Sequence, residues 1–256
     1  MEDKKISVYI LTYNNEDTIE KCIKSALWAD EIVILDHFSS DRTIEICRRY
    51  TDRIFQKEWT NYRDEYNYAI ELTTNKWVMF LDSDEEVTPE LADEIRRELA
   101  REEEWAGYLV PRMTHYLGRW IKHGGWYPDY KLRIFDKTRG RWEGKAFDPR
   151  VRVEGAVKKL RNPCLHYSFR NLDHHLSKMA VYTELFAEEA IKRGKKFGIW
   201  DLLLRPPLRF LRNYLLRGGF LDGIPGLVAA SMASYYVFLK YAKIWEKTNI
   251  DTMANK

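Results

Sequence analysis

Short apolar runs alternate with amphipathic stretches along the N-terminal part of the chain. Continuous apolar runs are typical of strands buried on both faces, and apolar residues three or four positions apart are typical of helices. The pattern predicts, in chain order, a strand at 6–12, a helix at 16–28, a strand at 31–35, a helix at about 42–50, a strand at 53–56, a helix at 61–72 and a strand at 76–81. Strands that alternate with helices form a parallel sheet with right-handed crossovers. The sequence therefore predicts an α/β fold with a mostly parallel central sheet flanked by helices.

The regular alternation stops after about residue 103. Residues 107–111 and 130–135 have the pattern of strands, and they flank a loop of tryptophan, glycine and tyrosine at 120–129. A loop with so many rings and donors is either a binding surface or a packed loop with its tryptophans buried beneath it. Lys131 and Arg133 alternate in the second strand, so we expect their side chains to face the same side.

The last part of the chain is predicted to be helical from about Leu172 onward. Residues 202–217 mix arginines with leucines and aromatic residues, as helices in a membrane interface do. Residues 224–239 have no charge, but this stretch is shorter than the ~20 apolar residues that a membrane-spanning helix needs. These helices either lie on a membrane or form a soluble cap, because leucine-rich faces also pack on domains. We expect a first domain at 1–170 and a helical region at 171–256.

Composition excludes several classes of function. The 42 basic and 39 acidic residues give a formal net charge of +3, so the chain lacks the strongly basic character of a nucleic-acid-binding protein. The three cysteines are widely separated and odd in number, which fits neither a disulfide framework nor a zinc site and favours a reducing cytosol. No apolar signal segment precedes the first strand, so we expect neither export nor an N-terminal anchor. The sequence does not indicate an oligomeric state.

The strongest chemical signal is a cluster of carboxylates at the end of the apolar run 77–81. Asp82 and Asp84 are separated by one residue in a turn, and both can converge on a hard cation such as Mg²⁺ or Mn²⁺. A cation held by one or two carboxylates is usually completed by water and by substrate phosphates. The alternative is an acidic helix start, because Thr88 and Pro89 have the pattern of an N-cap followed by proline at the first helical position.

Three polar features follow predicted strands and should meet at one edge of the sheet, where open α/β sheets bind ligands. They are the turn at 12–16, Asp36, and the pair Asp82 and Asp84. The first units contain no glycine-rich phosphate loop, which argues against dinucleotide and P-loop binding. Acidic residues must therefore bind a nucleotide. Asp36 would hydrogen-bond a ribose or a base edge, and Asp84 would bind a divalent cation. This arrangement predicts metal-assisted departure of a nucleoside diphosphate.

At this point the chain resembles a known family. Residues 12–16, the strand that ends in Asp36, and the segment 81–84 resemble the N-terminal half of family 2 glycosyltransferases, which have a GT-A fold and a DxD motif. Further segments are similar to bacterial lipopolysaccharide-core glucosyltransferases of the WaaE type: 107–112, 116–120, 123–133, 166–168 and 218–223. The resemblance covers nearly the whole chain. It implies a nucleotide-sugar donor, usually a UDP-sugar, inversion at the anomeric centre, and a growing lipid-linked or lipopolysaccharide-core glycan as acceptor at the cytoplasmic membrane face.

The resemblance also implies roles for individual residues. The donor site would comprise Thr12, Tyr13, Asn14, Glu16, Asp36, Arg63, Asn67, Asp82, Ser83 and Asp84. The transferred sugar or the acceptor would contact Trp126, Tyr127, Asp129, Lys131 and Arg133. Asp84 and His166 would bind the divalent cation, although a histidine beside a strand can also be purely structural.

The sequence departs from its relatives at the catalytic base. Relatives usually have a His-Glu or His-Asp pair after a Trp-x-Gly segment, and this chain has Asp148 and Pro149 at those positions. Asp148 is our predicted base, and Arg63 is predicted to supply a positive charge that relatives carry at Tyr66. If the base is absent, the chain is a nucleotide-sugar-binding or scaffold protein with the same fold. A metal-dependent nucleotidyltransferase would also use paired acids, but no basic phosphate-gripping loop follows the first strand.

Overall fold

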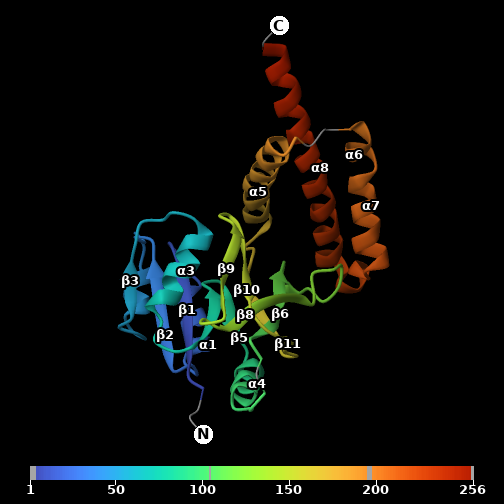
Figure 1. Cartoon of the computed structure of the whole chain (residues 1–256). Helices are drawn as coiled ribbons and strands as arrows, with labels where there is room; N and C mark the ends of the chain where they lie inside the picture. The colour runs from blue at the N-terminus through green and yellow to red at the C-terminus, as the bar shows by residue number, and fades with distance from the viewer. Residues whose placement is uncertain (1–3, 104, 195–197, 255–256) are drawn as a thin grey trace. The chain divides into compact units, whose positions relative to one another are not determined.

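The computed structural model describes residues 4–103, 105–194 and 198–254, with residues 250–254 described by their backbone (Figure 1). The chain divides into two compact units. We call residues 1–113 and 129–166 the sheet unit, and residues 114–128 and 167–256 the helical unit.

Parallel strands form the first half of the sheet unit. Its helices and strands are β1 (Ile6–Thr12), α1 (Ile19–Ala26), β2 (Glu31–Asp36), α2 (Thr43–Cys47), β3 (Ile54–Gln56), α3 (Tyr62–Leu72), β4 (Trp77–Asp82), β5 (Glu85–Val87), α4 (Pro89–Leu99), β6 (Gly107–Tyr116), β8 (Asp129–Asp136), β9 (Gly140–Lys145), β10 (Asp148–Val153), β11 (Val157–Lys159) and β12 (Cys164–His166). The order β3-β2-β1-β4 is parallel, and β8 and β6 extend it in antiparallel fashion. The predicted α/β architecture is therefore confirmed.

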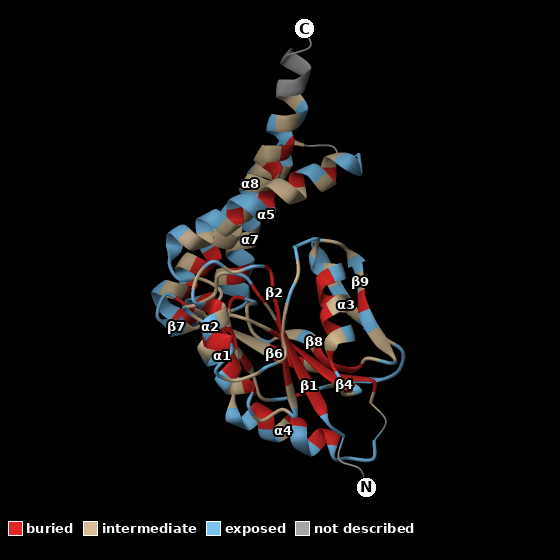
Figure 2. Cartoon of the chain, turned by 90° about the vertical axis from the view of Figure 1, so that its left-hand side faces the viewer, coloured by how far each residue is buried: buried red, intermediate tan, exposed pale blue. Residues whose placement is uncertain are grey.

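The central strands are mostly apolar, and both faces of the sheet are covered. Along β1, Val8 and Ile10 pack with apolar residues of α1 and α4 such as Ile19 and Leu91, whereas Tyr9 packs on the opposite face with residues of α3 and β9. Figure 2 shows the buried residues concentrated in the central strands. A strand buried on both faces has no alternation of polar and apolar positions, which is the pattern that the sequence shows.

The ladder between β6 and β8 is irregular at Arg133. The pairing moves from Ile134 directly to Leu132 and leaves Arg133 in a bulge, so whether Lys131 and Arg133 face the same side stays a prediction. Lys131 is exposed and pairs with Asp129, whereas Arg133 is 7% exposed at its side chain. The bulge thus coincides with the one of these two basic side chains that is buried.

The helical unit contains β7 (Arg119–Trp120), α5 (Leu172–Lys192), α6 (Ile199–Leu203), α7 (Arg205–Leu211), the π-helical turn η1 (Arg212–Leu216), the short helix η2 (Gly219–Asp222) and α8 (Gly223–Ala254). Segment 114–128 belongs to this unit, rather than to the first domain as we predicted. The reason is packing, since Tyr116 and Ile121 form a cluster with Ala229, Trp126 and Phe169. Among the helices of the described ranges, none combines the length and apolar character needed to cross a membrane.

A half-buried histidine in the helical unit gives a pH-dependent stability. His175 lies with Nδ1 2.8 Å from the Tyr116 hydroxyl and stacks on Phe169 at 4.1 Å. Burial, together with the nearby Lys178 and His174, lowers the pKa of His175 from 6.5 to about 4. Between these pH values the unfolded chain binds the proton and the folded chain does not, so stability should fall as pH decreases from 6.5 to about 4.

Guanidinium unfolding followed at several pH values measures this slope. His175→Gln should flatten it, because the substituted side chain no longer titrates. His174→Gln removes a smaller contribution to the lowered pKa of His175, so it should reduce the slope only slightly. An unchanged slope in His175→Gln would assign the pH dependence to other groups.

Candidate functional site

The acids that follow β4 lie in a turn and a short strand. β4 ends at Asp82, Ser83 and Asp84 form the turn, and β5 begins at Glu85. The helix α4 begins only at Pro89, after Thr88, whose hydroxyl accepts a hydrogen bond from the backbone N–H of Leu91. The cation-binding turn and the helix start were alternatives in the sequence, but they are different residues. β5 separates the carboxylates at 82–84 from the helix start at Thr88 and Pro89.

Asp84 and His166 come together although they are far apart in the sequence. β12 pairs with β5 in antiparallel register, with His166 opposite Glu85. This pairing places His166 Nε2 3.5 Å from Asp84 Oδ1, and the histidine side chain is 11% exposed. In the described ranges, the buried Nδ1 of His166 has no hydrogen-bond partner.

The spacing of this pair fits a divalent cation. Two neighbouring ligands of an octahedral cation at 2.0–2.1 Å lie about 3 Å apart, close to the observed separation of carboxylate oxygen and imidazole nitrogen. Within the described part of the chain, no group of three or more histidine, cysteine, aspartate or glutamate residues has the geometry of a metal site. A cation held by two side chains alone would take its remaining ligands from water and a phosphate-bearing ligand.

Beside this pair, Arg133 joins two carboxylates. Its guanidinium donates to Asp82 at 2.6 Å and to the fully buried Glu85 at 2.5 Å, and it lies 4.6 Å from the centroid of the Phe80 ring. Arg112 lies 3.5 Å from the same Glu85 carboxylate. Burial raises the pKa of Glu85, and the two guanidinium groups oppose that increase. The network fixes the Asp82 carboxylate, which is 32% exposed, at the end of β4.

Arg133 and Glu85 differ from the sequence prediction in two ways. We predicted a sugar or acceptor contact for Arg133, but its guanidinium is occupied by Asp82 and Glu85. Sequence reasoning missed Glu85 as a member of the site. Its alternation with buried Val87 in β5 is the signal that indicates an inward-facing acid.

The turn after β1 is tied to the turn after β4 through Asn15, which sequence reasoning also missed. The Asn15 side-chain oxygen accepts hydrogen bonds from Thr12 Oγ1 at 3.0 Å, Tyr13 N–H at 3.1 Å and Ser83 Oγ at 2.9 Å. The structure thus brings Thr12 and Ser83 together, as the meeting of strand ends predicts. The Tyr13 side chain is 58% exposed beside them.

Asp36 is fully buried at the end of β2 and holds the following loop. Its carboxylate accepts hydrogen bonds from Ser39 N–H at 2.9 Å, from Ser39 Oγ at 2.5 Å and from Gln56 Nε2 at 2.9 Å. Asn14 has a positive φ of 51°, and its side chain and backbone bind Ser40 and Ser39. In the same region, Glu16 pairs with the exposed Arg42 at 3.2 Å. These contacts join the turn after β1 to the loop after β2.

Arg63 and Asn67 hold the β9–β10 hairpin on α3. Asn67 Nδ2 donates to the Trp142 carbonyl and Asn67 Oδ1 accepts from the Trp142 N–H, both at 3.0 Å. Arg63 donates to the Gly144 carbonyl at 3.3 Å and to Asp64 at 2.8 Å. Arg63 and Asn67, which we predicted to bind the nucleotide-sugar, therefore contact the hairpin or a residue of their own helix.

Asp148 begins β10 at the tip of this hairpin, opposite Lys145, and is exposed. Its role as a base stays a prediction.

The predicted acceptor residues fall in both units. Trp126, in the helical unit, packs on the Tyr116 ring at 5.2 Å. Tyr127 is its neighbour in that unit, whereas Asp129, in the sheet unit, pairs with Arg112 at 2.7 Å.

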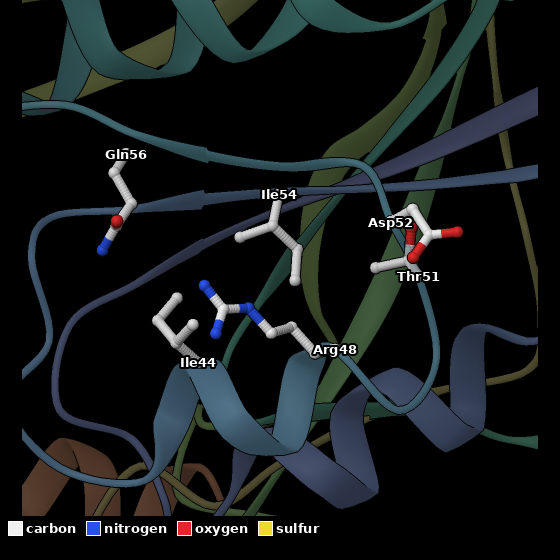
Figure 3. Close-up of a pocket in the computed structure, with 6 residues that line it drawn as sticks. All are labelled: Ile44, Arg48, Thr51, Asp52, Ile54 and Gln56. Carbon is white, nitrogen blue, oxygen red and sulfur yellow. The ribbon is translucent and has the colours of Figure 1, made fainter.

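A separate pocket of about 360 Å³ lies between α2 and β3 (Figure 3). It is lined by Ile44, Arg48, Thr51, Asp52, Ile54 and Gln56. Gln56 is its one lining residue that also binds Asp36. The carboxylates after β4 do not line this pocket.

The comparison with protein families is decisive, because the family model described as "Glycosyl transferase family 2" matches residues 7–153. The chain belongs to glycosyl transferase family 2. It is therefore a glycosyltransferase, and the resemblance inferred from the sequence is confirmed. The matched residues run from the second residue of β1 to the end of β10 and stop before His166.

Similar proteins cover this glycosyltransferase almost end to end. It is 27% identical over 257 residues to the lipopolysaccharide core biosynthesis glycosyltransferase LpsC of Rhizobium meliloti, with 98% of this chain and 95% of LpsC aligned. An uncharacterized glycosyltransferase of Rickettsia typhi is 28% identical over 95% of this chain and 87% of its own length. A solved structure, the mannosyltransferase PcManGT of Pyrobaculum calidifontis in complex with GDP-Man and Mn²⁺, aligns with a TM-score of 0.53 at 13% identity, over 94% of this chain and 87% of that one. The latter shows that the glycosyltransferase has the GT-A fold.

Proposed function

We propose that this glycosyltransferase is metal-dependent and inverting, and that it moves a hexose from a UDP-sugar to a lipid-linked or lipopolysaccharide-type glycan. The pairing of Asp84 with His166 beside Asp82 is the observation that carries the metal dependence. Similarity to LpsC over 98% of the chain supports the class of acceptor.

The side chains divide the work of binding and orientation. A divalent cation held by Asp84 and His166 would neutralise charge that develops on the departing diphosphate. Arg133 fixes the Asp82 carboxylate, which is the group we assign to the ribose. Because these groups are held by hydrogen bonds before the donor binds, little reorganisation is needed at the moment of transfer.

Direct inversion requires a base that takes the proton from the acceptor hydroxyl. We assign this proton transfer to Asp148, whose carboxylate is exposed at the tip of the β9–β10 hairpin. The same exposure and the neighbouring Pro149 favour a second candidate function, a nucleotide-sugar-binding or scaffold protein without turnover.

A donor panel tests these alternatives. The protein is incubated with UDP-, GDP-, dTDP- and ADP-sugars, with Mn²⁺ or Mg²⁺ and a lipid-linked glycan extract, and released nucleotide is measured. Asp148→Asn should lower transfer by about 100-fold or more while donor binding stays intact, since general base catalysis contributes this much. Glu154→Gln, which removes an exposed acid just after the hairpin, is the matched control and should retain full transfer.

The alternatives predict different products. Binding of a nucleotide-sugar without turnover in the unmodified protein would support the scaffold function. Release of pyrophosphate in place of nucleoside diphosphate would identify a nucleotidyltransferase and overturn the proposal.

We further propose that the enzyme works at the cytoplasmic face of the membrane, where it would meet a lipid-linked acceptor. The mixture of arginines and leucines at 202–217 supports this location.

A further inference from the structure

Charge is distributed unevenly along the helical unit. Between Asp201 and Glu246 the sequence has six lysines and arginines but one acid, Asp222. That acid is 1% exposed, and its carboxylate accepts hydrogen bonds from the backbone N–H groups of Lys122 and His123. Two of the six cations pair with acids outside these bounds or at their edge, Arg205 with Asp201 and Lys243 with Glu184, so the positive charge without a counter-ion lies in the arginines that follow Arg205.

Three arginines of this segment make no ion pair with any described residue: Arg209, Arg212 and Arg217. Arg205 differs, since it pairs with Asp201 and lies 5.3 Å from the centroid of the Tyr241 ring. Within the described chain, the buried Nε of Arg209 has no hydrogen-bond partner. Burial and the charges of Arg212 and Arg217 lower the pKa of Arg209, so the three guanidinium groups lie close enough to repel one another.

The position of Arg217 is fixed by packing against the segment at 114–128. Gly125 has a φ of +81°, and a Cβ added there would overlap the Arg217 guanidinium. The carbonyl of Arg217 also accepts a hydrogen bond from the Gly124 N–H at 2.9 Å. A cation held in place without a counter-ion is suited to bind an external anion.

Leucines on the same helix point outward instead of into the core. Leu208 is 59% exposed, Leu211 45%, Leu215 53% and Leu216 84%. Leu208 and Leu211 are three positions apart, which places them on one face of α7, and Leu215 and Leu216 follow in the π-helical turn η1. A soluble helix turns such a stripe inward, so this exposed stripe marks an interaction surface.

The arginines form a second stripe beside the leucines. At 3.6 residues per turn, the stripe of Arg209 and Arg212 lies about 100° around the helix axis from the leucine stripe. Cations beside an apolar stripe match the boundary between lipid phosphates and acyl chains. A symmetric contact with a second copy would bring the same unpaired arginines together, which disfavours self-association.

We propose that the leucine–arginine surface, formed by Leu208, Leu211, Leu215, Leu216, Arg209, Arg212 and Arg217, lies in the headgroup layer of an anionic bilayer. The leucines insert among the acyl chains, and the three arginines bind lipid phosphates. This inference rests on the membrane location proposed above and deepens it by naming the surface and the lipid chemistry.

Vesicle flotation of the full chain tests the proposal, with phosphatidylcholine vesicles compared to vesicles that contain about 30% phosphatidylglycerol. The unmodified protein should float with the anionic vesicles, and added salt should weaken this binding. R209Q/R212Q/R217Q should weaken binding by about 100-fold, at roughly fivefold per arginine. L208S/L215S should also lower binding, because it removes apolar area from the buried face.

Matched controls separate this surface from general charge and from catalysis. R48Q/R150Q/R152Q removes the same charge from exposed arginines of the sheet unit and should float like the unmodified protein. Asp84→Asn should also float normally, so a failure of the proposed catalysis would leave the flotation result unaffected. Circular dichroism confirms that each variant is folded.

Several results would overturn the proposal. These are no flotation of the unmodified protein, equal flotation of R209Q/R212Q/R217Q and R48Q/R150Q/R152Q, and a lipid-free dimer that L208S/L215S converts to a monomer. The last result would assign the leucines to a contact between copies of the chain.

Discussion

Asp84→Asn should lower metal-dependent cleavage of the sugar donor by about 100-fold or more. The asparagine keeps the size of the side chain but removes the negative charge that we assign to the cation, and Lewis-acid stabilisation of a leaving group contributes several kcal/mol. The rest of the site should remain in place, because the Asp82, Glu85 and Arg133 network has its own hydrogen bonds. The measurement is the rate of nucleoside diphosphate release at saturating donor.

Calorimetric titration of UDP with and without Mn²⁺ gives a second readout that does not depend on turnover. Mn²⁺ should strengthen UDP binding to the unmodified protein and should lose this effect in Asp84→Asn. Glu90→Gln is the matched control, because it removes an exposed acid in the first turn of α4. Equal metal dependence in Asp84→Asn and Glu90→Gln would rule out the assigned cation site.

Arg133→Met should lower the free energy of unfolding by about 3–5 kcal/mol, because removal of one partner leaves buried charge uncompensated. Arg133 is 7% exposed and binds both Asp82 and Glu85, and Glu85 is fully buried. Chemical denaturation measures the loss. Arg49→Met is the matched control, because its ion pair with Glu45 is exposed and should contribute little.

The destabilisation in Arg133→Met should depend on pH. Burial raises the pKa of Glu85, so the folded chain binds this proton more readily than the unfolded chain, and stability decreases as pH rises through the folded pKa. Loss of the guanidinium raises that pKa further. The deficit relative to the unmodified protein should therefore be larger at about pH 8 than at about pH 5. A deficit independent of pH would show that Glu85 stays ionised in both proteins.

The sequence predicts the layout of the site better than its contacts. Apolar runs that end in polar residues identify β1, β2 and β4, and the rule that parallel strands share a carboxyl edge brings Thr12 and Ser83 together. The pairing of Asp84 with His166 depends on the register of β12 against β5, and only the family resemblance indicated it.

Other features of the site cannot be predicted from local pattern. The Asn15 side chain accepts hydrogen bonds from three groups, and one of them, the Ser83 hydroxyl, is 68 positions away in the sequence. A periodic pattern of apolar residues does not predict such a contact. The bulge at Arg133 inserts one residue into the register, which alternation cannot foresee. Asn67 was assigned to the donor, yet its amide pairs with the backbone of Trp142, which lies 75 positions later.

The helical unit is discontinuous in sequence, and this constrains how the protein can be divided. A truncation after residue 170 would leave Tyr116, Ile121 and Trp126 without the part of their cluster that α8 supplies. A self-sufficient sheet unit instead requires removal of both 114–128 and the C-terminal helices. Arg112 and Asp129 are register partners in β6 and β8, so a two-residue turn between these strands could close the gap. Any deletion or exchange of the helical unit in this glycosyltransferase must therefore replace its two segments together.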